Sequence, residues 1–290
     1  AKLYRHAVDS AAFGIKAEAV SYDQLTVIKR KKKVVRRLVA GIRNQMNEAG
    51  VEVINQMAMI LPREGDPFRV QADKELYEGR NLMIATGSEP VILPLPGIRE
   101  GLGKTVITNR EILDLEEIPQ RLVVIGGGVI GLEMACYYQA VGSQVVVVEM
   151  LDHIAGTIDS EIGRRLQQVY ENLGMVFHLS ACVTRVDGGT VFFEKDGAEH
   201  QESGDIILLS CGRRPVTSGF GLEQLPVAVN RGAIVVNEQM ETSCPGVYAI
   251  GDVVGGFMLA HAASREGEVA VNHMLGIDDR MSNCAIPSVI

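Results

Sequence analysis

The sequence contains no apolar stretch that approaches the roughly twenty residues required by a membrane-spanning helix. Apolar residues make up 47% and charged residues 22% of its 290 residues, which is typical of a folded chain and not of a disordered one. A chain of this length exceeds one ordinary domain. We therefore expect a water-soluble protein with two domains, each with a sizeable core, and no membrane contact.

The sequence also has no excess of basic residues, because its formal net charge is -8 at pH 7. This balance argues against a general nucleic-acid binder, although it allows a local basic surface. We expect small molecules or other proteins as partners and no nucleic acid.

The five cysteines form no close pair, and the nearest two, Cys182 and Cys211, lie 29 positions apart. The sequence has no Cys-x-x-Cys and no spacing typical of a zinc site, so we expect no metal. We expect the cysteines to be buried, reduced thiols. This expectation, together with the lack of a signal peptide, indicates the cytoplasm or an equivalent reducing compartment. The thiols in question are Cys136, Cys182, Cys211, Cys244 and Cys284.

The most informative segment that is present is a dinucleotide-binding fingerprint in its full context. An apolar run at 121–125 leads into the glycine-rich 126–131, and a second apolar run at 144–148 ends in Glu149. Between them, residues 129–141 are predicted to form a helix that packs on a parallel sheet. The alternative is a structural glycine-rich turn in an unrelated parallel sheet.

Each glycine of the fingerprint has a predicted role. Gly126 permits the tight turn after the strand, Gly128 lets the backbone approach a pyrophosphate, and Gly131 lets the helix pack closely. The phosphates would lie at the amino end of the helix, where unpaired N–H groups favour anions. Glu149 would accept both ribose hydroxyls and repel a 2′-phosphate, which predicts NAD rather than NADP.

Residues 23–50 predict a long amphipathic helix, because apolar side chains recur with a period near 3.6. The other face of this helix is basic, which would suit an acidic partner or a phosphate backbone. The alternative is an ordinary solvated helix face. The basic residues are Lys29, Arg30, Lys31, Lys32, Lys33, Arg36 and Arg37.

Short extended runs after this helix predict a small antiparallel meander. These runs are 51–60, 68–72 and 82–85. A proline-rich crossing follows, and then a short helix at 109–115. Beyond Glu149 we predict a helix at 159–173, with Ile162, Leu166 and Val169 on one face, and strands at 175–178, 182–186, 190–194 and 205–210.

Near the end of the sequence, a predicted strand ends in Gly251 and Asp252. A carboxylate at this position could face a sugar or polyol chain, or it could cap the next helix. A helix of small residues is predicted from Met258 to His273, and its first N–H groups could face a second phosphate-bearing cofactor.

With these segments the chain resembles the flavin disulfide reductases, the flavin-dependent pyridine nucleotide-disulfide oxidoreductases. The resemblance rests on ATGSEP at 85–90, GGGVIGLEMA at 126–135, CGRRP at 211–215, TSCPGVYAIGD at 242–252 and MLAHAA at 258–263. These motifs occur in the right order, and the resemblance covers essentially every residue. Within the family, the chain is most similar to the dihydrolipoyl dehydrogenases.

The resemblance implies an α/β fold with two three-layer Rossmann-like domains, in which an NAD domain is inserted into an incomplete FAD domain and each carries a small antiparallel β-meander. The implied boundaries are 1–113 and 243–290 for the FAD domain and 114–242 for the NAD domain. The implied NAD contacts are Gly126, Gly127, Gly128, Val129, Ile130, Gly131, Glu149, Val183 and Gly212. The implied FAD contacts are Thr86, Gly87, Ser88, Asp252, Met258, Leu259, Ala260 and His261, with Ala58 as a weaker match.

The resemblance also implies parts that this sequence lacks: a first fingerprint for FAD, a close redox cysteine pair, a flavin-side lysine, and a carboxyl-terminal histidine with its glutamate. We therefore expect a fragment cut at both ends, with no catalytic residue of its own. It would bind NAD without turning over dihydrolipoamide, and it would hold FAD weakly or not at all.

The resemblance implies that the parent enzyme oxidises protein-bound dihydrolipoamide through a redox disulfide and FAD, with hydride transfer to NAD. Its implied partner is the lipoyl-bearing acyltransferase of a 2-oxo acid dehydrogenase complex, or the glycine cleavage system. The parent would be a homodimer, in the cytoplasm or in a mitochondrial matrix. Two alternatives stay open: another flavin disulfide reductase, such as a mercuric reductase or a transhydrogenase, and a non-catalytic nucleotide-binding or assembly module.

Overall fold

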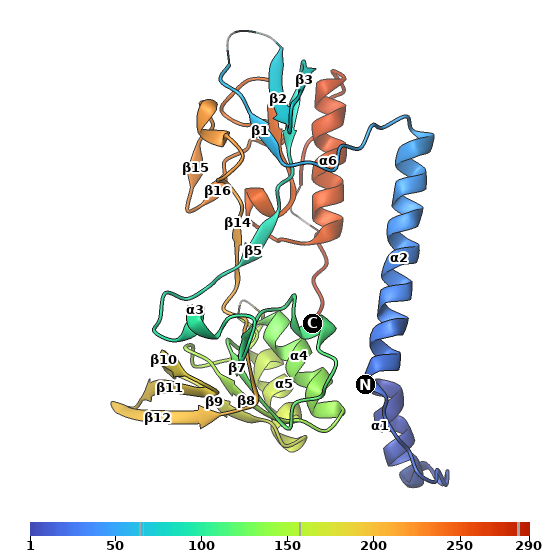
Figure 1. The fold of residues 1–290 in the computed structure, drawn as a ribbon, viewed down its shortest axis with the longest axis vertical. Coiled ribbons are helices and arrows are strands. Elements are labelled where there is room, and N and C mark those ends of the chain that lie inside the picture. The colour runs from blue at the N-terminus through green and yellow to red at the C-terminus, as the bar shows by residue number, and fades with distance from the viewer. Residues whose placement is uncertain (64, 66, 157, 283–284) are drawn as a thin grey trace. The chain divides into compact units, whose positions relative to one another are not determined.

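The computed structural model describes residues 1–63, 65, 67–156, 158–282 and 285–290. The chain has an α/β fold that divides into two compact units (Figure 1). Unit 1 contains Ala1–Met46, Pro90–Gly212 and Ile290, and unit 2 contains Asn47–Glu89 and Arg213–Val289. These boundaries differ from the predicted ones at 113 and 242, and the assignment of each unit to a cofactor stays a prediction.

Unit 1 is built on a five-stranded parallel sheet with the strand order β6-β13-β7-β8-β9. The strands are β6 (Val106–Ile107), β7 (Arg121–Ile125), β8 (Gln144–Val148), β9 (Val176–His178) and β13 (Ile206–Leu209). Valines 145 to 148 are all at most 3% exposed, as expected for a parallel strand covered on both faces. The predicted strands at 121–125, 144–148, 175–178 and 205–210 are thus confirmed.

Alternate residues of β7 face two different cores. Leu122 and Val124 pack with the helices α4 (Val129–Ala140) and α5 (Ser160–Asn172), while Val123 and Ile125 pack with the opposite layer. That layer is an antiparallel meander of β10 (Cys182–Asp187), β11 (Thr190–Lys195) and β12 (Ala198–Ser203). Figure 1 shows the helices on one side of the sheet and the meander on the other.

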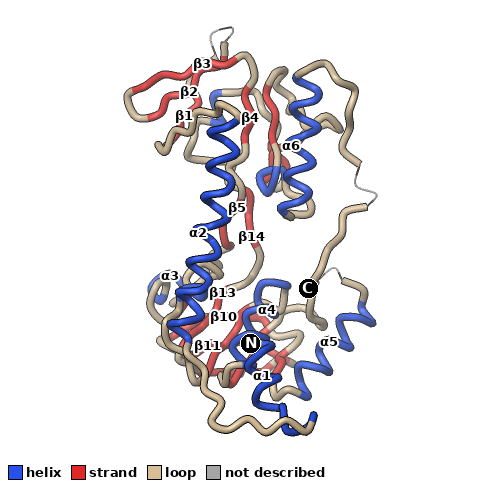
Figure 2. The backbone as a smooth tube through the Cα atoms, turned by 90° about the vertical axis from the view of Figure 1, so that its right-hand side faces the viewer, coloured by secondary structure: helices blue, strands red, loops and turns tan. Residues whose placement is uncertain are grey.

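The amino-terminal part of unit 1 holds α1 (Lys2–Val8), the 3₁₀ turn η1 (Asp9–Phe13) and α2 (Gln24–Glu48). The predicted long helix is confirmed as α2, which is a single uninterrupted helix (Figure 2). Its first turns are fixed to unit 1, because Ile28 is 5% exposed and the Gln24 side chain donates to the Leu115 carbonyl at 2.8 Å. The remaining short elements of unit 1 are α3 (Ile98–Gly101) and η2 (Ile112–Asp114).

Unit 2 contains a three-stranded antiparallel sheet and a parallel strand pair. The antiparallel strands are β1 (Ala58–Ile60), β2 (Phe68–Ala72) and β3 (Glu75–Gly79), and the parallel pair is β4 (Leu82–Ile84) with β17 (Val247–Ala249). The other elements are β5 (Ser88–Pro90), β14 (Arg213–Pro215), η3 (Leu222–Gln224), β15 (Val229–Asn230), β16 (Ala233–Ile234), η4 (Gly251–Val254) and α6 (Ala260–Met274). The helix predicted to begin near residue 258 is confirmed as α6.

Five details of the sequence prediction are wrong. The predicted extended run 51–60 forms a strand only over Ala58–Ile60, as β1. The third strand of the first meander is β3, whereas residues 82–84 pair in parallel with β17. The strand β12 was not predicted, and the helix expected at 109–115 is only the 3₁₀ turn η2. In α5, Ile162 and Val169 are 59% and 53% exposed, because the helix packs through Gly163 and Tyr170 instead.

The four described cysteines are free thiols, as expected, but they are not all buried. Cys244 is buried, Cys136 and Cys211 are half-buried, and Cys182 is exposed. The expectation for Cys284 lies outside the described residues. Within the described part of the chain, no helix is both long and apolar enough to cross a membrane.

Candidate nucleotide site

The glycine-rich loop connects the end of β7 to the start of α4. Gly126 has φ +100°, and a Cβ at this position would lie 2.6 Å from the Ser210 carbonyl oxygen. A Cβ on Gly131 would lie 2.3 Å from the Gly126 carbonyl oxygen. Both positions therefore require glycine, one for the turn and one for the close packing of α4, as the fingerprint predicts.

Gly128 is the N-cap residue of α4, and its surroundings differ from those of the other two glycines. A Cβ on Gly128 would meet nothing within 4 Å. The space beside it is thus open, and the first N–H groups of α4 have no partner within the helix. Such an amino end attracts an anion through its N–H groups and the helix dipole.

Glu149 follows β8 and is held beside the glycine loop by two backbone donors. Its Oε2 accepts from the Gly127 N–H at 2.6 Å, and its Oε1 accepts from the Leu151 N–H at 2.8 Å. The loop after β8 is tied to the glycine loop as well, because the Ala155 N–H donates to the Gly127 carbonyl at 2.8 Å. The carboxylate is therefore placed beside the amino end of α4 before any ligand arrives.

A cavity of about 520 Å³ lies at this edge of the parallel sheet and is lined entirely by residues of unit 1. Five of the predicted NAD contacts line it: Gly126, Gly128, Glu149, Val183 and Gly212. The other four predicted contacts, Gly127, Val129, Ile130 and Gly131, belong to the same loop and helix start without lining the cavity.

Sequence reasoning missed part of this cavity wall. Met150 and Leu151 follow β8, and Ser210 and Cys211 follow β13, so their place after a parallel strand could have identified them. The segment 93–95 comes from outside the fingerprint and carries no local signal.

The two cysteines of this cavity differ in their surroundings. Burial, and then the negative charge of Glu149, raise the pKa of the Cys211 thiol to about 12, so it stays protonated at neutral pH. Its Sγ lies 3.4 Å from the Ile125 carbonyl oxygen. Cys182 is exposed. Cys211 is thus a neutral wall residue and not a thiolate nucleophile.

In unit 2, the structure brings together two of the predicted FAD contacts. The Ser88 hydroxyl donates to the Asp252 carboxylate, and Arg213 donates to the Ser88 hydroxyl at 2.8 Å and to its carbonyl at 2.7 Å. The Gly251 N–H donates to the Glu266 carboxylate at 2.6 Å. Asp252 therefore belongs to a part-buried polar group, and it does not cap α6, whose N-cap is Leu259.

The other predicted FAD contacts lie around this group or apart from it. The Thr86 hydroxyl donates to the Val216 carbonyl, and Gly87 has φ +71° with open space beside it. Met258 has φ +47°, and Leu259, Ala260 and His261 form the start of α6. Ala58 lies elsewhere in unit 2, at the exposed start of β1.

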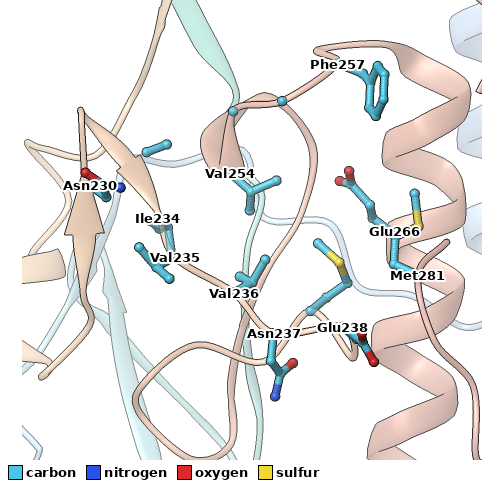
Figure 3. Close-up of a pocket in the computed structure, with 14 residues that line it drawn as sticks. Asn230, Ile234, Val235, Val236, Asn237, Glu238, Val254, Phe257, Glu266 and Met281 are labelled. Carbon is cyan, nitrogen blue, oxygen red and sulfur yellow. The ribbon is translucent and has the colours of Figure 1, made fainter. Parts of the chain in front are cut away.

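Unit 2 also contains a cavity of about 540 Å³, shown in Figure 3. Val236, Val254 and Met281 form apolar parts of its wall, and Glu266 and Glu238 contribute carboxylates. None of the predicted FAD contacts lines this cavity. Among the residues that the structure describes, no group of three His, Cys, Asp or Glu side chains is arranged to hold a metal ion.

The chain is similar to known proteins over nearly its whole length. It is 37% identical to the dihydrolipoyl dehydrogenase of Acholeplasma laidlawii over 98% of this chain and 83% of the relative. It is 35% identical to a dihydrolipoyl dehydrogenase of Bacillus subtilis and 35% identical to the mitochondrial one of Pisum sativum, over 99% of this chain in each case. The chain spans 62% and 59% of the lengths of these two relatives.

Solved structures show the same fold. LpdA from Mycobacterium tuberculosis superposes with a TM-score of 0.85 at 27% identity, over 97% of this chain and 62% of that chain. The HOCl-induced flavoprotein disulfide reductase RclA from Escherichia coli superposes with a TM-score of 0.77 at 28% identity, over 90% of this chain and 59% of that chain.

The model of one protein family, described as pyridine nucleotide-disulphide oxidoreductase, matches residues 3–267. This match contains both the glycine loop with Glu149 and the Ser88–Asp252 group. The chain therefore belongs to the pyridine nucleotide-disulphide oxidoreductase family.

Proposed function

We propose that unit 1 binds NAD in the cavity at the carboxyl ends of β7, β8 and β13. One observation carries this proposal: the anion-attracting start of α4, the fixed carboxylate of Glu149 and a cavity of about 520 Å³ occur together at one sheet edge. Ligands of open α/β sheets bind at this edge.

The residues present fit a dinucleotide. The open space beside Gly128 leaves room for a pyrophosphate at the α4 amino end, where no cation is required. Glu149 offers acceptor oxygens for ribose hydroxyls, and its charge would oppose a 2′-phosphate. The half-buried, protonated Cys211 and the backbone of Gly212 would form part of the wall.

NAD supplies a hydride acceptor when it is bound. The residues of this chain would bind and orient it: the α4 amino end would hold the phosphates, Glu149 would fix the ribose, and Val183 would contact the base or sugar. The supporting contacts between Glu149 and the Gly127 and Leu151 N–H groups keep the carboxylate in place.

For unit 2 we propose an incomplete FAD domain with a three-layer Rossmann-like plan, in which Asp252 and Ser88 face the ribityl side of the flavin nucleotide. Two features support this proposal: the Ser88–Asp252 hydrogen bond, and the start of α6, which follows η4 after a short loop. Because the sequence offers no second glycine fingerprint for the pyrophosphate, we expect weak or no FAD binding by this chain.

We further propose that this chain contributes the NAD-binding part of an enzyme that oxidises protein-bound dihydrolipoamide and passes the electrons through a disulfide and FAD to NAD. Its partner would be the lipoyl-bearing acyltransferase of a 2-oxo acid dehydrogenase complex or the glycine cleavage system. Several relatives at 35 to 37% identity are dihydrolipoyl dehydrogenases, which supports this choice over a mercuric reductase or a transhydrogenase.

Isothermal titration calorimetry of the 290-residue chain tests the NAD proposal. We expect one NAD per chain and at least about tenfold weaker binding of NADP, because a 2′-phosphate would meet the Glu149 carboxylate. No heat of binding with NAD at about 1 mM, or equal affinity for NADP, would contradict it.

A further inference from the structure

The basic helix α2 takes no part in the proposed nucleotide site. Its 25 residues contain eight Lys and Arg and a single acid, Glu48, which gives a charge of +7. The remaining 265 residues contain 20 basic and 35 acidic side chains, a charge of -15, and the two parts together give the net -8 of the chain. An acidic chain thus carries one helix of strongly opposite charge.

The basic side chains of α2 share one face. At about 100° per residue, seven of the eight fall within about 160° of the helix circumference. Lys29, Lys33 and Arg37 form one row at i, i+4 spacing, and Lys32, Arg36 and Arg43 form a second row beside it. The apolar side chains, Val34, Val35, Leu38, Val39 and Ile42, occupy the opposite arc.

This face is accessible, and most of its charges lack a partner. Lys31 and Lys32 pair with Asp114 at 2.9 and 3.3 Å, which holds the first half of α2 to η2. The structure gives no ion pair within 4 Å for the other basic residues of α2 to any residue it describes. These residues are Lys29, Arg30, Lys33, Arg36, Arg37 and Arg43, and all six are exposed.

We propose that this basic face of α2 docks an acidic helical segment of a partner protein. Carboxylates at i, i+4 spacing on the partner would match the two rows of cations, and each row spans about two to three helical turns. The long-range attraction of a +7 helix would also steer such a partner to this face.

Two other polyanions fit the face less well. Single-stranded nucleic acid uses aromatic side chains for base stacking, and α2 contains none. An anionic membrane binds a basic amphipathic helix through its apolar arc as well as its charges, and the apolar arc of α2 contains none of the Trp or Phe side chains that anchor such helices in the interface.

The test is a fluorescence-anisotropy titration with a labelled, alanine-rich helical peptide that carries Glu at i, i+4 positions. The key variant is Lys29→Gln/Lys33→Gln/Arg37→Gln, which keeps helix propensity while removing one row of charge. The matched control, Lys74→Gln/Lys104→Gln/Arg231→Gln, removes the same charge from exposed positions outside α2. Circular dichroism verifies that both variants stay folded.

We expect the peptide to bind the unaltered chain at about 50 mM salt and to lose about tenfold in affinity at about 300 mM salt. The α2 variant should bind about tenfold more weakly, and the control should match the unaltered chain within about twofold. Equal losses in both variants would overturn the proposal, as would no binding at about 50 mM salt. Tighter binding of a single-stranded RNA or of anionic phosphatidylglycerol vesicles than of the peptide would also overturn it.

Discussion

The substitution Glu149→Gln tests the proposed nucleotide site most sharply, because it keeps the shape of the side chain and removes its charge. In the structure the carboxylate accepts from two backbone N–H groups, at 2.6 and 2.8 Å. Glutamine has one acceptor oxygen, so one of the two N–H groups would face an amide NH₂ instead. Hydrogen bonds to a charged group are worth about 1.5 to 3 kcal/mol, and for this half-buried side chain we expect the lower end, about 1.5 kcal/mol.

Urea unfolding measures that loss of stability, and calorimetry measures the change in binding. We expect NAD to bind about tenfold more weakly to the variant, because the ribose hydroxyls lose a charged acceptor. NADP should bind no more weakly than before, since the repulsion of its 2′-phosphate is removed. The preference for NAD over NADP should therefore fall by at least about tenfold.

Glu161→Gln is the matched control. Glu161 lies on the exposed face of α5, where it pairs with Arg165 at i, i+4 spacing and 2.6 Å. Such a pair contributes about 0.3 to 0.5 kcal/mol, so stability and NAD binding should stay nearly unchanged. If folded Glu149→Gln bound NAD as tightly as the unaltered chain, the reasoning from the carboxylate would be refuted.

The glycine loop, Cys211 and the flavin content of the chain each give a further test. Gly131→Ala should lower the free energy of unfolding in urea by about 2 kcal/mol, because the new Cβ would lie 2.3 Å from the Gly126 carbonyl oxygen. Gly128→Ala has open space beside it, so it should keep its stability but bind NAD about tenfold more weakly. Equal destabilisation by the two substitutions would contradict this prediction. The pKa of Cys211 is raised from 9.0 to about 12 in the folded chain, so its contribution to stability is complete below pH 9 and is lost as the pH rises to about 12. Over this range, Cys211→Ala should reduce the slope of unfolding free energy against pH by up to about 1.4 kcal/mol per pH unit. An unchanged slope would count against burial as the cause of the raised pKa. The purified chain should lack stoichiometric flavin absorbance and should form no NADH from dihydrolipoamide and NAD, and measurable turnover would overturn the assignment of the dithiol chemistry to parts outside this sequence.

Much of unit 1 could be predicted because its signals are local in the chain. The run from 121 to 149 contains strand, turn, helix, strand and acid in order, and each step follows from residue type and spacing. The positions of Gly126 and Gly131 even determine how closely α4 approaches the sheet. The same holds for α2, whose period is visible along its whole length.

The errors come from contacts that local patterns do not encode. β12 contains no large apolar residue, so only its backbone pairing with β11 makes it a strand. β3 is mostly exposed and is defined by a two-residue turn that joins it to β2. In α5, a Cβ on Gly163 would lie 3.3 Å from the Ile154 carbonyl oxygen, so the helix packs at its glycine and turns Ile162 and Val169 outward.

The candidate site shows the same division. Glu149 and the glycine loop could be named from the sequence, but the segment 93–95 lines the cavity only because the fold brings it to the sheet edge. The role of Arg213 as a donor to Ser88 likewise depends on the pairing of β5 with β14, two segments more than 120 positions apart in the chain.

Hydrogen exchange measured by mass spectrometry, with and without saturating NAD, locates the bound ligand along the chain. We predict slower exchange in four segments that contain cavity-lining residues: 125–131, 148–151, 181–183 and 210–212. The peptides of unit 2 should exchange at unchanged rates. Protection confined to other segments, or none at a concentration where calorimetry reports saturation, would contradict the proposal that NAD binds at the carboxyl ends of β7, β8 and β13.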